Sequence, residues 1–528
     1  MRHFHSYGPV DCEEHFCLAR RELVDACFRQ LMGNPEKGGH FFTIWAPRQT
    51  GKTWLMRETE KKIGEIYGGQ FMTVKMSCQG IILENDDPVD AFLQKVPKLI
   101  LDSLDRDIKA PVSWEEWMLL FHKRLGIFEK PVILFIDEFD SLPPKVIDRL
   151  VTLFRDMYLN RESYCLHGLA LIGVRAVLGV ESLRGSPFNI QRSLHVPNFT
   201  YEETLELFRQ YQEESSQKID PAVVKKLHES LRGQPGLVCW FGELLTEKFN
   251  PGKDRTIGME EWSLVWRKAL YTEWNNTVLN LVKKAKNLYQ KEVLDLFCHS
   301  DIQFSMDANW CAYLYLNGLI SSETVRDEKG ENIEVCRFSC PFIQIRLYNA
   351  LTGELIGDRL PILALHPLDE LSDVFDSDKL NIPALLNRYK DYLKRLKEKG
   401  LNPWKDQPRR TDLHLTEAVG HFHLYFWLQN AVGRICSVSP EFPTGNGKVD
   451  LHLKCGEKQA LIEVKSFTDA ARAKAGRTQA AHYAKKCGLN TVTLVLFVPV
   501  EDEDILQKLS GEWETDGIQV SVCAIGWT

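Results

Sequence analysis

One short stretch limits what this chain can fold into more than any other. An apolar run that begins at His40 leads into Ala46-Pro-Arg-Gln-Thr-Gly51-Lys52-Thr53, and a helical pattern follows as far as Tyr67. A loop between a strand and a helix can direct several backbone N–H groups at one phosphate chain. In such a loop Gly51 lets the backbone approach closely, Lys52 reaches the β- and γ-phosphates, and the Thr53 hydroxyl ligates Mg²⁺.

The loop departs from the usual pattern at its first position, where Ala46 stands in place of glycine. Alanine has less backbone freedom than glycine, and a chance turn is the alternative interpretation of the loop taken alone. The strand before it and the helix after it favour a site for ATP. The predicted nucleotide-binding residues are Arg48, Gln49, Thr50, Gly51, Lys52, Thr53 and Asp137.

A second apolar strand, residues 131–136, ends in Asp137 and Glu138. Asp137 can hold Mg²⁺, often through water, and Glu138 can polarise the water that attacks the phosphate. Hydrolysis also needs an arginine against the charge of the transition state. Arg175 is the first candidate and Arg192 the second, although either could instead be a surface ion-pair residue.

Strands that alternate with helices predict an α/β, doubly wound parallel sheet in the first part of the chain. Thr200 and Glu203 form a capping box at the start of a helical region, which predicts a lid over the sheet. Two helices and a hairpin then follow in the order of a winged helix. The predicted segments are a P-loop ATPase core at 1–199, a helical lid at 200–275, a winged-helix-like domain at 276–360, a linker and helix at 361–405, and an α/β domain at 406–528.

Bulk properties restrict location and partners. The net charge of −7 argues against a protein that simply coats nucleic acid, so contact with DNA or RNA needs a local basic patch. Without an apolar run of about 18 residues or an apolar core after the start, we expect neither a membrane span nor a signal peptide. The 14 cysteines include no C-x-x-C pair, which predicts reduced thiols in a cytoplasmic protein. Zinc held by Cys12 and Cys17, or by Cys336 and Cys340, is disfavoured by the spacings.

The order of several motifs resembles one known group of proteins. The P-loop is followed by Ile136-Asp-Glu-Phe-Asp140, Gly173-Val-Arg175, Asn198-Phe-Thr-Tyr-Glu-Glu203 and Gly233-Gln-Pro235. Together they resemble the AAA-like, archaeal-type or STAND-like P-loop ATPases of prokaryotes, whose similar members carry a C-terminal nuclease domain of the PD-(D/E)xK superfamily. Thr416-Glu417-Ala418 resembles the opening of that domain. The resemblance implies that Ala46 is tolerated and that the chain combines both activities.

The nuclease chemistry of that superfamily needs two carboxylates on adjacent strands to hold Mg²⁺ and a lysine near the attacking water. Residues 448–453 and 460–465 are separated by a polar turn and predict a hairpin. Glu463 and Lys465 then share one face, because side chains alternate along a strand, and Asp450 on the neighbouring strand can meet Glu463. The alternative is an exposed pair of strand residues without catalytic function.

The resemblance adds residues around this centre. Glu417 is similar to the superfamily's first-helix carboxylate and is expected among the metal ligands. Gln479 and Tyr483 stand at i and i+4 on one helix face, in the Q-x-x-x-Y pattern of RecB-related nucleases. Basic residues near them predict a nucleic-acid-binding surface: Arg472, Lys474 and Arg477.

These motifs together predict an ATP-regulated, Mg²⁺-dependent nuclease that cuts DNA. The resemblance, rather than any residue, implies a role in prokaryotic defence against phage or mobile DNA. Mn²⁺ is a possible substitute at the nuclease site. A homo-oligomer is expected, since no arginine is unambiguously in place within one chain, and partner proteins of a defence system are possible. Two alternatives stay open: an ATP-dependent switch whose C-terminal domain binds without cutting, and a DNA-remodelling ATPase. The winged-helix-like domain can serve equally as a DNA-binding module or as a scaffold.

Overall fold

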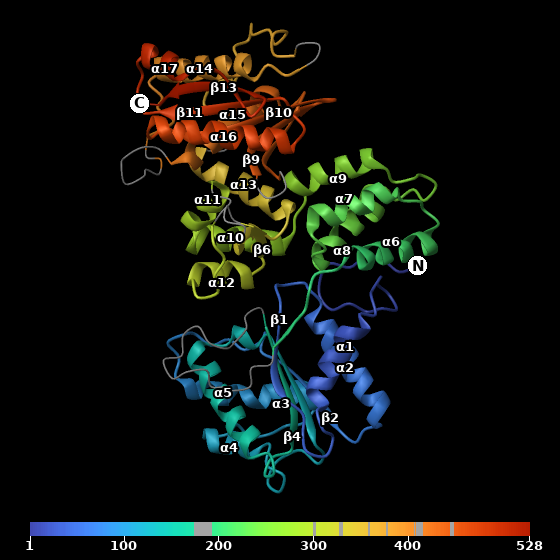
Figure 1. The fold of residues 1–528 in the computed structure, drawn as a ribbon. Coiled ribbons are helices and arrows are strands. Elements are labelled where there is room, and N and C mark those ends of the chain that lie inside the picture. Colours follow the sequence, from blue (N-terminus) through green and yellow to red (C-terminus); the bar gives the residue numbers. More distant parts are fainter. Residues whose placement is uncertain are drawn as a thin grey trace. The chain divides into compact units, whose positions relative to one another are not determined.

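The computed structural model describes most of the chain, and Figure 1 shows its elements. The described residues are 1–173, 193–298, 302–326, 331–356, 360–375, 379–405, 407, 416–443 and 448–527. They divide into two compact units. Unit 1 contains residues 1–281, 306–320 and 339–342, and unit 2 contains residues 282–305, 321–338 and 343–528. The bounds of the five predicted segments stay predictions.

Unit 1 is built on a parallel five-stranded sheet with the order β2-β3-β4-β1-β5. Its strands are β1 (Phe41–Trp45), β2 (Met72–Ser77), β3 (Val132–Asp137), β4 (Leu166–Gly173) and β5 (Ser193–His195). The α/β fold with a parallel sheet is therefore confirmed. The three-residue β5 was not predicted, because so short a strand has no readable period.

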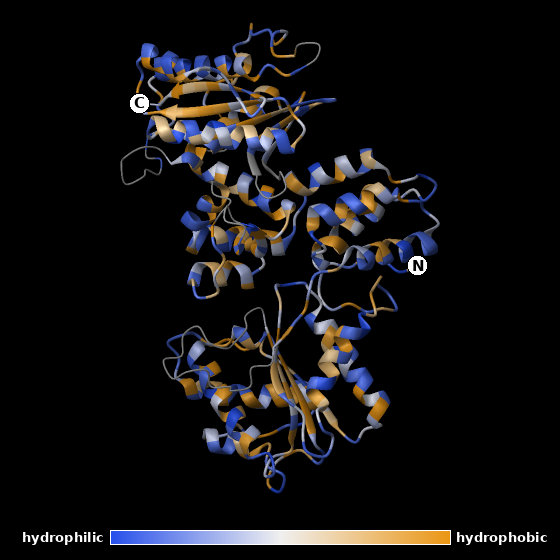
Figure 2. Ribbon diagram, in the orientation of Figure 1, coloured by the Kyte–Doolittle hydropathy of each residue, from blue (hydrophilic) through white to orange (hydrophobic). Residues whose placement is uncertain are grey.

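Helices cover both faces of this sheet, as parallel strands require. The helical segments are α1 (Arg21–Met32), α2 (Lys52–Tyr67), η1 (Val89–Lys95), α3 (Val96–Leu104), α4 (Trp114–Leu119), η2 (Phe139–Ser141) and α5 (Pro144–Leu159). Alternate residues of β3 enter two different cores: Leu134 joins the core on the side of α3 and α5, and Phe135 joins the core on the side of α1 and α2. Figure 2 shows the apolar character of these strands.

A helical region follows the sheet, and it begins where the sequence predicts. Thr200 accepts a hydrogen bond from the Glu203 N–H, and the Glu203 carboxylate accepts one from the Thr200 N–H, so the capping box is formed. The helices are α6 (Tyr201–Ser215), α7 (Pro221–Leu231), α8 (Pro235–Glu243), the π-helical η3 (Leu244–Lys248), α9 (Met259–Tyr271) and α10 (Asn276–Leu288).

The middle of the chain has the predicted order of two helices and a hairpin. The elements are α11 (Gln290–Cys298), α12 (Asn309–Leu316), β6 (Ile320–Arg326), β7 (Asn332–Phe338) and α13 (Pro341–Ile356). The strands β6 and β7 form a two-stranded sheet, and Gln303 pairs with Val335 of β7 in an isolated bridge. The helix α13 was not predicted. The winged helix itself stays a prediction.

The C-terminal part of unit 2 contains a six-stranded mixed sheet with the order β12-β13-β11-β10-β9-β8. Its elements are α14 (Ile382–Glu398), α15 (Glu417–Val432), β8 (Ser437–Pro443), β9 (Lys448–Cys455), β10 (Lys458–Ser466), α16 (Ala470–Lys486), β11 (Thr491–Val498), α17 (Glu503–Leu509), β12 (Gly511–Thr515) and β13 (Ile518–Gly526). β9 and β10 form the predicted antiparallel hairpin, while β10 and β11 run parallel.

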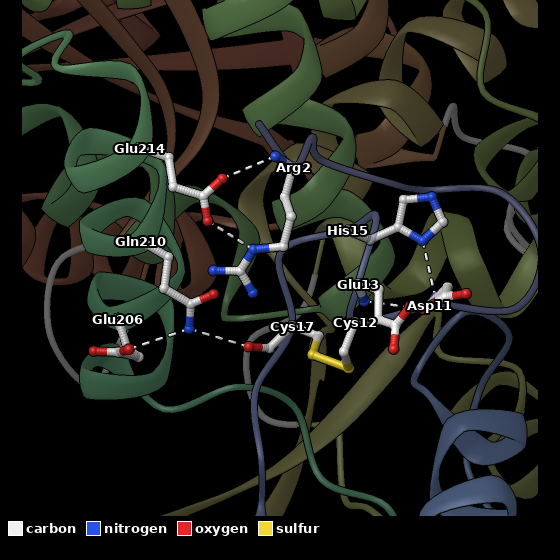
Figure 3. The surroundings of a disulfide bond; sticks show 9 residues. All are labelled: Arg2, Asp11, Cys12, Glu13, His15, Cys17, Glu206, Gln210 and Glu214. Atoms are coloured by element: carbon white, nitrogen blue, oxygen red, sulfur yellow. Dashed lines mark hydrogen bonds and ion pairs between the residues drawn. A yellow bond between two sulfur atoms is a disulfide. The ribbon is translucent and has the colours of Figure 1, made fainter.

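Two disulfides contradict the prediction that all the cysteines are reduced. Cys12 pairs with Cys17 in the N-terminal segment (Figure 3), and Cys436 pairs with Cys455. The second bond joins the start of β8 to the end of β9, where Ser437 and Lys454 are register partners. Neither pair has C-x-x-C spacing, so a search for that motif could not find them. Among the helices that the structure describes, none is long and apolar enough to cross a membrane.

Two glycines of unit 1 provide a matched test of its packing. A Cβ at Gly168 in β4 would lie 2.5 Å from the Leu31 carbonyl oxygen, whereas a Cβ at Gly64 in α2 would meet nothing within 4 Å. Gly168→Ala should therefore destabilise unit 1 by about 1–3 kcal/mol, because the obstacle is backbone. Gly64→Ala should leave it equal or more stable, by up to about 1 kcal/mol, because alanine favours helix. The thermal unfolding midpoints of the two variants measure both effects. Equal midpoints for Gly168→Ala and Gly64→Ala would contradict the close approach of Gly168 to Leu31.

Candidate functional site

The loop between β1 and α2 has the geometry of a phosphate-binding loop. Gly51 has a φ of 91°, a left-handed conformation that favours glycine. Lys52 is 8% exposed, and its Nζ donates hydrogen bonds to the carbonyl oxygens of Ala46, at 2.8 Å, and Pro47, at 2.7 Å. The Lys52 side chain thus spans the loop from its end to its start, and the two hydrogen bonds hold the loop in a closed turn around that side chain.

The two residues predicted to hold Mg²⁺ lie in contact. Thr53 Oγ1 donates to Asp137 Oδ2 at 3.0 Å, and Asp137 Oδ1 accepts a hydrogen bond from the Glu138 N–H at 2.9 Å. A hydroxyl and a carboxylate are the oxygen ligands that Mg²⁺ prefers. The donor set of the described site therefore fits Mg²⁺.

Burial and charge set the protonation of this site. Burial lowers the pKa of Lys52 to about 8, even though Glu138 and Asp137 favour its charged form. Burial also raises the pKa of Glu138, and the neighbouring carboxylates of Asp137 and Asp140 add to this shift. A raised pKa suits a carboxylate that accepts a proton near neutral pH. Glu138 has a φ of 52°, a strained conformation of the kind found at functional sites.

The helical region of unit 1 contacts the loop through Gly233-Gln-Pro-Gly236. The Gly236 N–H donates to the Gln49 carbonyl oxygen at 3.0 Å, and Gln234 Nε2 donates to the Arg48 carbonyl oxygen at 3.2 Å. A Cβ at Gly236 would lie 2.6 Å from the Cβ of Gln49, so only glycine fits here. The start of α8 is therefore held against the phosphate-binding loop.

The other wall of this site was not predicted from the sequence. A cavity of about 800 Å³ is lined by the loop, by Asp137 and Glu138, by α8, and by a segment between His5 and Arg20. That volume is typical of sites for cofactors. The Ser6 carbonyl oxygen accepts a hydrogen bond from Gln49 Nε2 at 2.8 Å, which joins the segment to the loop. No motif marks this segment, because its role depends on a contact between residues 43 positions apart.

The arginine predicted to act in hydrolysis, Arg175, lies outside the described residues, as does Arg192. Arg20 does line the cavity, but its Nε donates to Glu203 Oε1 at 3.0 Å and its Nη2 to the Pro197 carbonyl oxygen at 2.9 Å. Arg20 thus joins the N-terminal segment to the start of α6.

A second cluster of charged side chains lies in unit 2, on β9, β10 and α15. Ile462 pairs with Leu451, so Asp450 lies one position further along, beside Glu463. Asp450 Oδ2 accepts a hydrogen bond from the Val464 N–H at 2.6 Å. Lys465 Nζ lies 2.8 Å from Glu417 Oε1 and 3.0 Å from Glu463 Oε1. The structure therefore brings together all four residues predicted for the nuclease centre.

Burial dominates the electrostatics of this cluster. Glu463 is 1% exposed and Asp450 is 5% exposed. Burial, and then the charge of Asp450, raise the pKa of Glu463. Burial disfavours the charge of Lys465, but the carboxylates around it outweigh that effect and raise its pKa. The buried Glu463 Oε2 has no hydrogen-bond partner within the described structure, so one oxygen remains for a cation.

One neighbour of the cluster was not predicted. His421 of α15 is 2% exposed, and its Nε2 donates to the Asp450 carbonyl oxygen at 3.0 Å. This bond fixes the backbone that carries the Asp450 carboxylate. The sequence gives no signal for it, since a histidine inside an apolar helix is most often a satisfied core residue.

The predicted nucleic-acid-binding residues lie on α16. Gln479 Nε2 donates to Tyr483 Oη at 2.9 Å, so this i, i+4 pair is in contact. Arg472 Nε lies 4.0 Å from Asp469 Oδ2, and Lys474 is exposed. The guanidinium carbon of Arg477 lies over the Trp513 ring, 4.6 Å from the ring centroid. A Cβ at Gly476 would lie 3.5 Å from Lys465 Cγ. The helix therefore covers the strand that carries Lys465, while Arg477 points to β12.

Family models match one range of residues in each of the two units. Residues 5–250 match the family model of an AAA-like domain. This part of the chain is an AAA-like P-loop ATPase domain. Its matched range includes the cavity wall between His5 and Arg20, which supports a role for that segment in the domain. Residues 414–499 match a domain family of unknown function. No curated protein matches the chain.

Solved structures similar to this chain are P-loop ATPases at low identity. The Walker-type ATPase of Pyrococcus abyssi is 14% identical, with 65% of this chain and 99% of that chain covered and a TM-score of 0.44. The Orc1 protein of Aeropyrum pernix in complex with DNA is 15% identical, with 64% and 94% covered and a TM-score of 0.32. The RuvB Holliday junction branch migration motor of Thermotoga maritima is 14% identical, with 60% and 92% covered and a TM-score of 0.32.

The ATP site can be tested with two substitutions that separate binding from hydrolysis. Lys52→Ala should weaken ATP binding at least tenfold, because the buried ammonium beside the loop is lost. Glu138→Gln should retain ATP affinity and slow hydrolysis about 100-fold or more, because only the carboxylate that accepts a proton is removed. Fluorescent-nucleotide titration and phosphate release measure the two effects. Wild-type turnover in Glu138→Gln would mean that another group is the base.

The cluster in unit 2 predicts pH-dependent metal binding. A raised folded-state pKa at Glu463 stabilises the metal-free unit at low pH, and this stabilisation is lost as the pH rises through that pKa. Metal binding requires the ionised carboxylate, so Mn²⁺ affinity should rise by up to about tenfold per unit of pH between about 6 and 8. Glu463→Gln should abolish the rise, and the exposed Glu457→Gln should keep it. Mn²⁺ affinity is measured by calorimetric titration of the nucleotide-free protein. An affinity that does not change with pH would contradict the raised pKa of Glu463.

Proposed function

We propose that the chain is an ATP-regulated, Mg²⁺-dependent nuclease that cuts DNA. The single observation that carries the cutting activity is the cluster of the buried Asp450 and Glu463 with the half-buried Lys465 and Glu417. With all three carboxylates ionised, they and the one ammonium leave two negative charges in a place with little solvent. One divalent cation balances them, and buried charge is costly unless it is balanced.

The donor set fits a metal of the Mg²⁺ type. Glu463 Oε2 is buried without a partner, and Asp450 presents a second carboxylate from the neighbouring strand. When bound, Mg²⁺ orients a water and stabilises the charge that develops on the phosphate oxygens. Mn²⁺ has the same ligand preferences and is a possible substitute.

The protein's own groups have separate roles in the proposed reaction. Asp450 and Glu463 hold the metal, and the Val464 N–H orients the Asp450 carboxylate. Lys465 holds Glu417 and Glu463 in place, and its ammonium neutralises charge on the phosphate or on the attacking water. Gln479 and Tyr483, with the basic residues of α16, are proposed to position the nucleic acid rather than to perform the chemistry.

The ATPase half is proposed to regulate the cutting. Lys52 Nζ donates its hydrogen bonds to carbonyl oxygens of the loop. When ATP binds, the ammonium is proposed to pair with the phosphates instead of with these neutral groups. Thr53 and Asp137 are proposed to hold Mg²⁺, and Glu138 is proposed to accept a proton from the attacking water. ATP-dependent homo-oligomers, with an arginine supplied by a neighbouring subunit, remain part of the proposal, as does Arg175. A role in prokaryotic defence, with or without partner proteins, rests on the resemblance alone.

A second candidate function is an ATP-dependent switch or remodelling ATPase whose C-terminal domain grips nucleic acid without cutting it. The contact between Lys465 and Glu417 is the observation in its favour, since a lysine paired with carboxylates can be purely structural. The two candidates differ in one measurable property, metal-dependent cleavage.

The cutting centre is tested by cleavage of plasmid and single-stranded DNA, with and without ATP and with Mg²⁺ or Mn²⁺. Asp450→Ala, Glu463→Ala and Lys465→Ala should each lower cleavage about 100-fold or more and leave ATP binding unchanged. Gln479→Ala should be milder, because a positioning residue is lost.

Two exposed neighbours provide matched controls, Glu457→Ala in the β9–β10 turn and Lys454→Ala on β9. Both should cut like the wild type. Circular dichroism shows whether each variant is folded, which matters for Lys465→Ala because it leaves buried carboxylates unpaired. Cleavage that survives in folded Asp450→Ala and Glu463→Ala would remove the nuclease assignment and favour the second candidate.

A further inference from the structure

Three histidines gather in the N-terminal segment, and of these His5 also lines the cavity of unit 1. The candidate ligand nitrogens of His3, His5 and His15 all lie within 4.8 Å of one another. The rings of His5 and His15 are stacked with centroids 4.0 Å apart, and the ring of His3 meets that of His15 edge-on at 4.7 Å. Three imidazoles in one place, without a hydrogen bond between them, form an arrangement that suits a shared cation.

The backbone explains why the three rings converge. Residues 3 and 15 form a parallel β-bridge, in which the His3 N–H donates to the Glu14 carbonyl oxygen and the Phe16 N–H donates to the His3 carbonyl oxygen, both at 3.0 Å. Side chains alternate along an extended segment, so His3 and His5 share one side. Phe4 takes the other side and is 2% exposed.

The Phe4 side chain fixes this segment to the helical region of unit 1. Its ring packs against Phe208 and Tyr211 of α6, and a Cβ at Gly242 of α8 would lie 2.4 Å from that ring. The Phe4 N–H donates to Glu247 Oε1 at 3.1 Å. The histidines therefore stand on a backbone held by a buried aromatic anchor.

A backbone hydrogen bond occupies one of the two ring nitrogens of His15. His15 Nδ1 accepts a hydrogen bond from the Asp11 N–H at 2.9 Å, as Figure 3 shows. That bond leaves Nε2 for a ligand, which is how a backbone partner orients a metal-binding histidine. The Cys12–Cys17 disulfide closes the turn that carries His15. Burial lowers the pKa of His5 and of His15, which favours the neutral imidazoles that bind metal.

We propose that His3, His5 and His15 bind one divalent transition metal ion, with Zn²⁺ as the reference ion. Imidazole nitrogens suit Zn²⁺, Ni²⁺ and Cu²⁺, whereas Mg²⁺ prefers oxygen ligands. Tetrahedral Zn²⁺ with bonds of about 2.0–2.1 Å needs nitrogens about 3.4 Å apart. Because the His5 and His15 rings are stacked at an interplanar angle of 10°, one of the two rings must turn out of the stack before both can bind the same ion. His3 opens onto a surface hollow, where water can complete the coordination.

The proposed metal site adjoins the cavity of unit 1. His5 itself lines the cavity of unit 1, and Ser6, the next residue, contacts Gln49 of the phosphate-binding loop. A metal ion would fasten residues 3–15 as a rigid wall of that cavity. This consequence rests on the proposed nucleotide site, but metal binding itself does not.

The test uses the full chain without a histidine tag, with the disulfide intact and excess Mg²⁺ present to fill oxygen-ligand sites. Titration with Zn²⁺ should give one site per chain with a Kd below about 1 µM, and should raise the thermal unfolding midpoint. His3→Ala and His5→Ala should each weaken Zn²⁺ binding at least tenfold and remove the thermal shift. His482→Ala on α16 is the matched control and should bind like the wild type.

The choice of variants keeps the test clear of folding effects. His3 is exposed, so His3→Ala should stay folded even where the buried His15 does not tolerate replacement. Cobalt(II) absorption in the visible range, present in the wild type and absent in His3→Ala, would support a defined site. Several weak Zn²⁺ sites, or equal Zn²⁺ affinity in the wild type and His3→Ala, would overturn the proposal. ATP binding and DNA cleavage are measured separately, so their failure leaves this result intact.

Discussion

Each candidate site is organised around a lysine, buried in the case of Lys52 and half-buried in the case of Lys465, and the balance of charge around that lysine decides what the site can bind. Lys52 is held by two neutral carbonyl groups, so burial dominates and its pKa falls. Lys465 is held by two carboxylates, so their charge dominates and its pKa rises. The first site has positive charge to offer an anion. The second has excess negative charge to offer a cation.

The parts of these sites that the sequence predicts are the local ones. Gly51-Lys52-Thr53 lies within one loop, and Glu463 with Lys465 lies within one strand, so spacing alone fixes their relative positions. Even the contact of Asp450 with Glu463 follows from a hairpin with a short turn. The four charged residues of unit 2 came together as expected, because only Glu417 had to be placed from a distant element, and a family resemblance supplied it.

The parts that could not be predicted depend on contacts between distant residues without a motif. Ser6 accepts a hydrogen bond from Gln49, Arg20 pairs with Glu203, and Phe4 packs into the helical core. No sequence pattern predicts which residue each of them contacts. The disulfides escaped for a similar reason, since Cys436 and Cys455 are neighbours only because β8 pairs with β9. His3 and His5 alternate in the sequence, but their third partner is placed by the β-bridge to His15.

The difference in charge balance also bears on what unit 2 can do. A domain that only grips nucleic acid gains from exposed cations, and it gains nothing from burying carboxylates that repel phosphate. Asp450 and Glu463 are almost fully buried, and Lys465 alone cannot neutralise the carboxylates around it. Keeping all of these carboxylates ionised is unfavourable unless a cation joins them, and without one the raised pKa of Glu463 favours its protonated form. A cluster of this kind is therefore poorly suited to binding phosphate directly, and it favours the proposed divalent metal site.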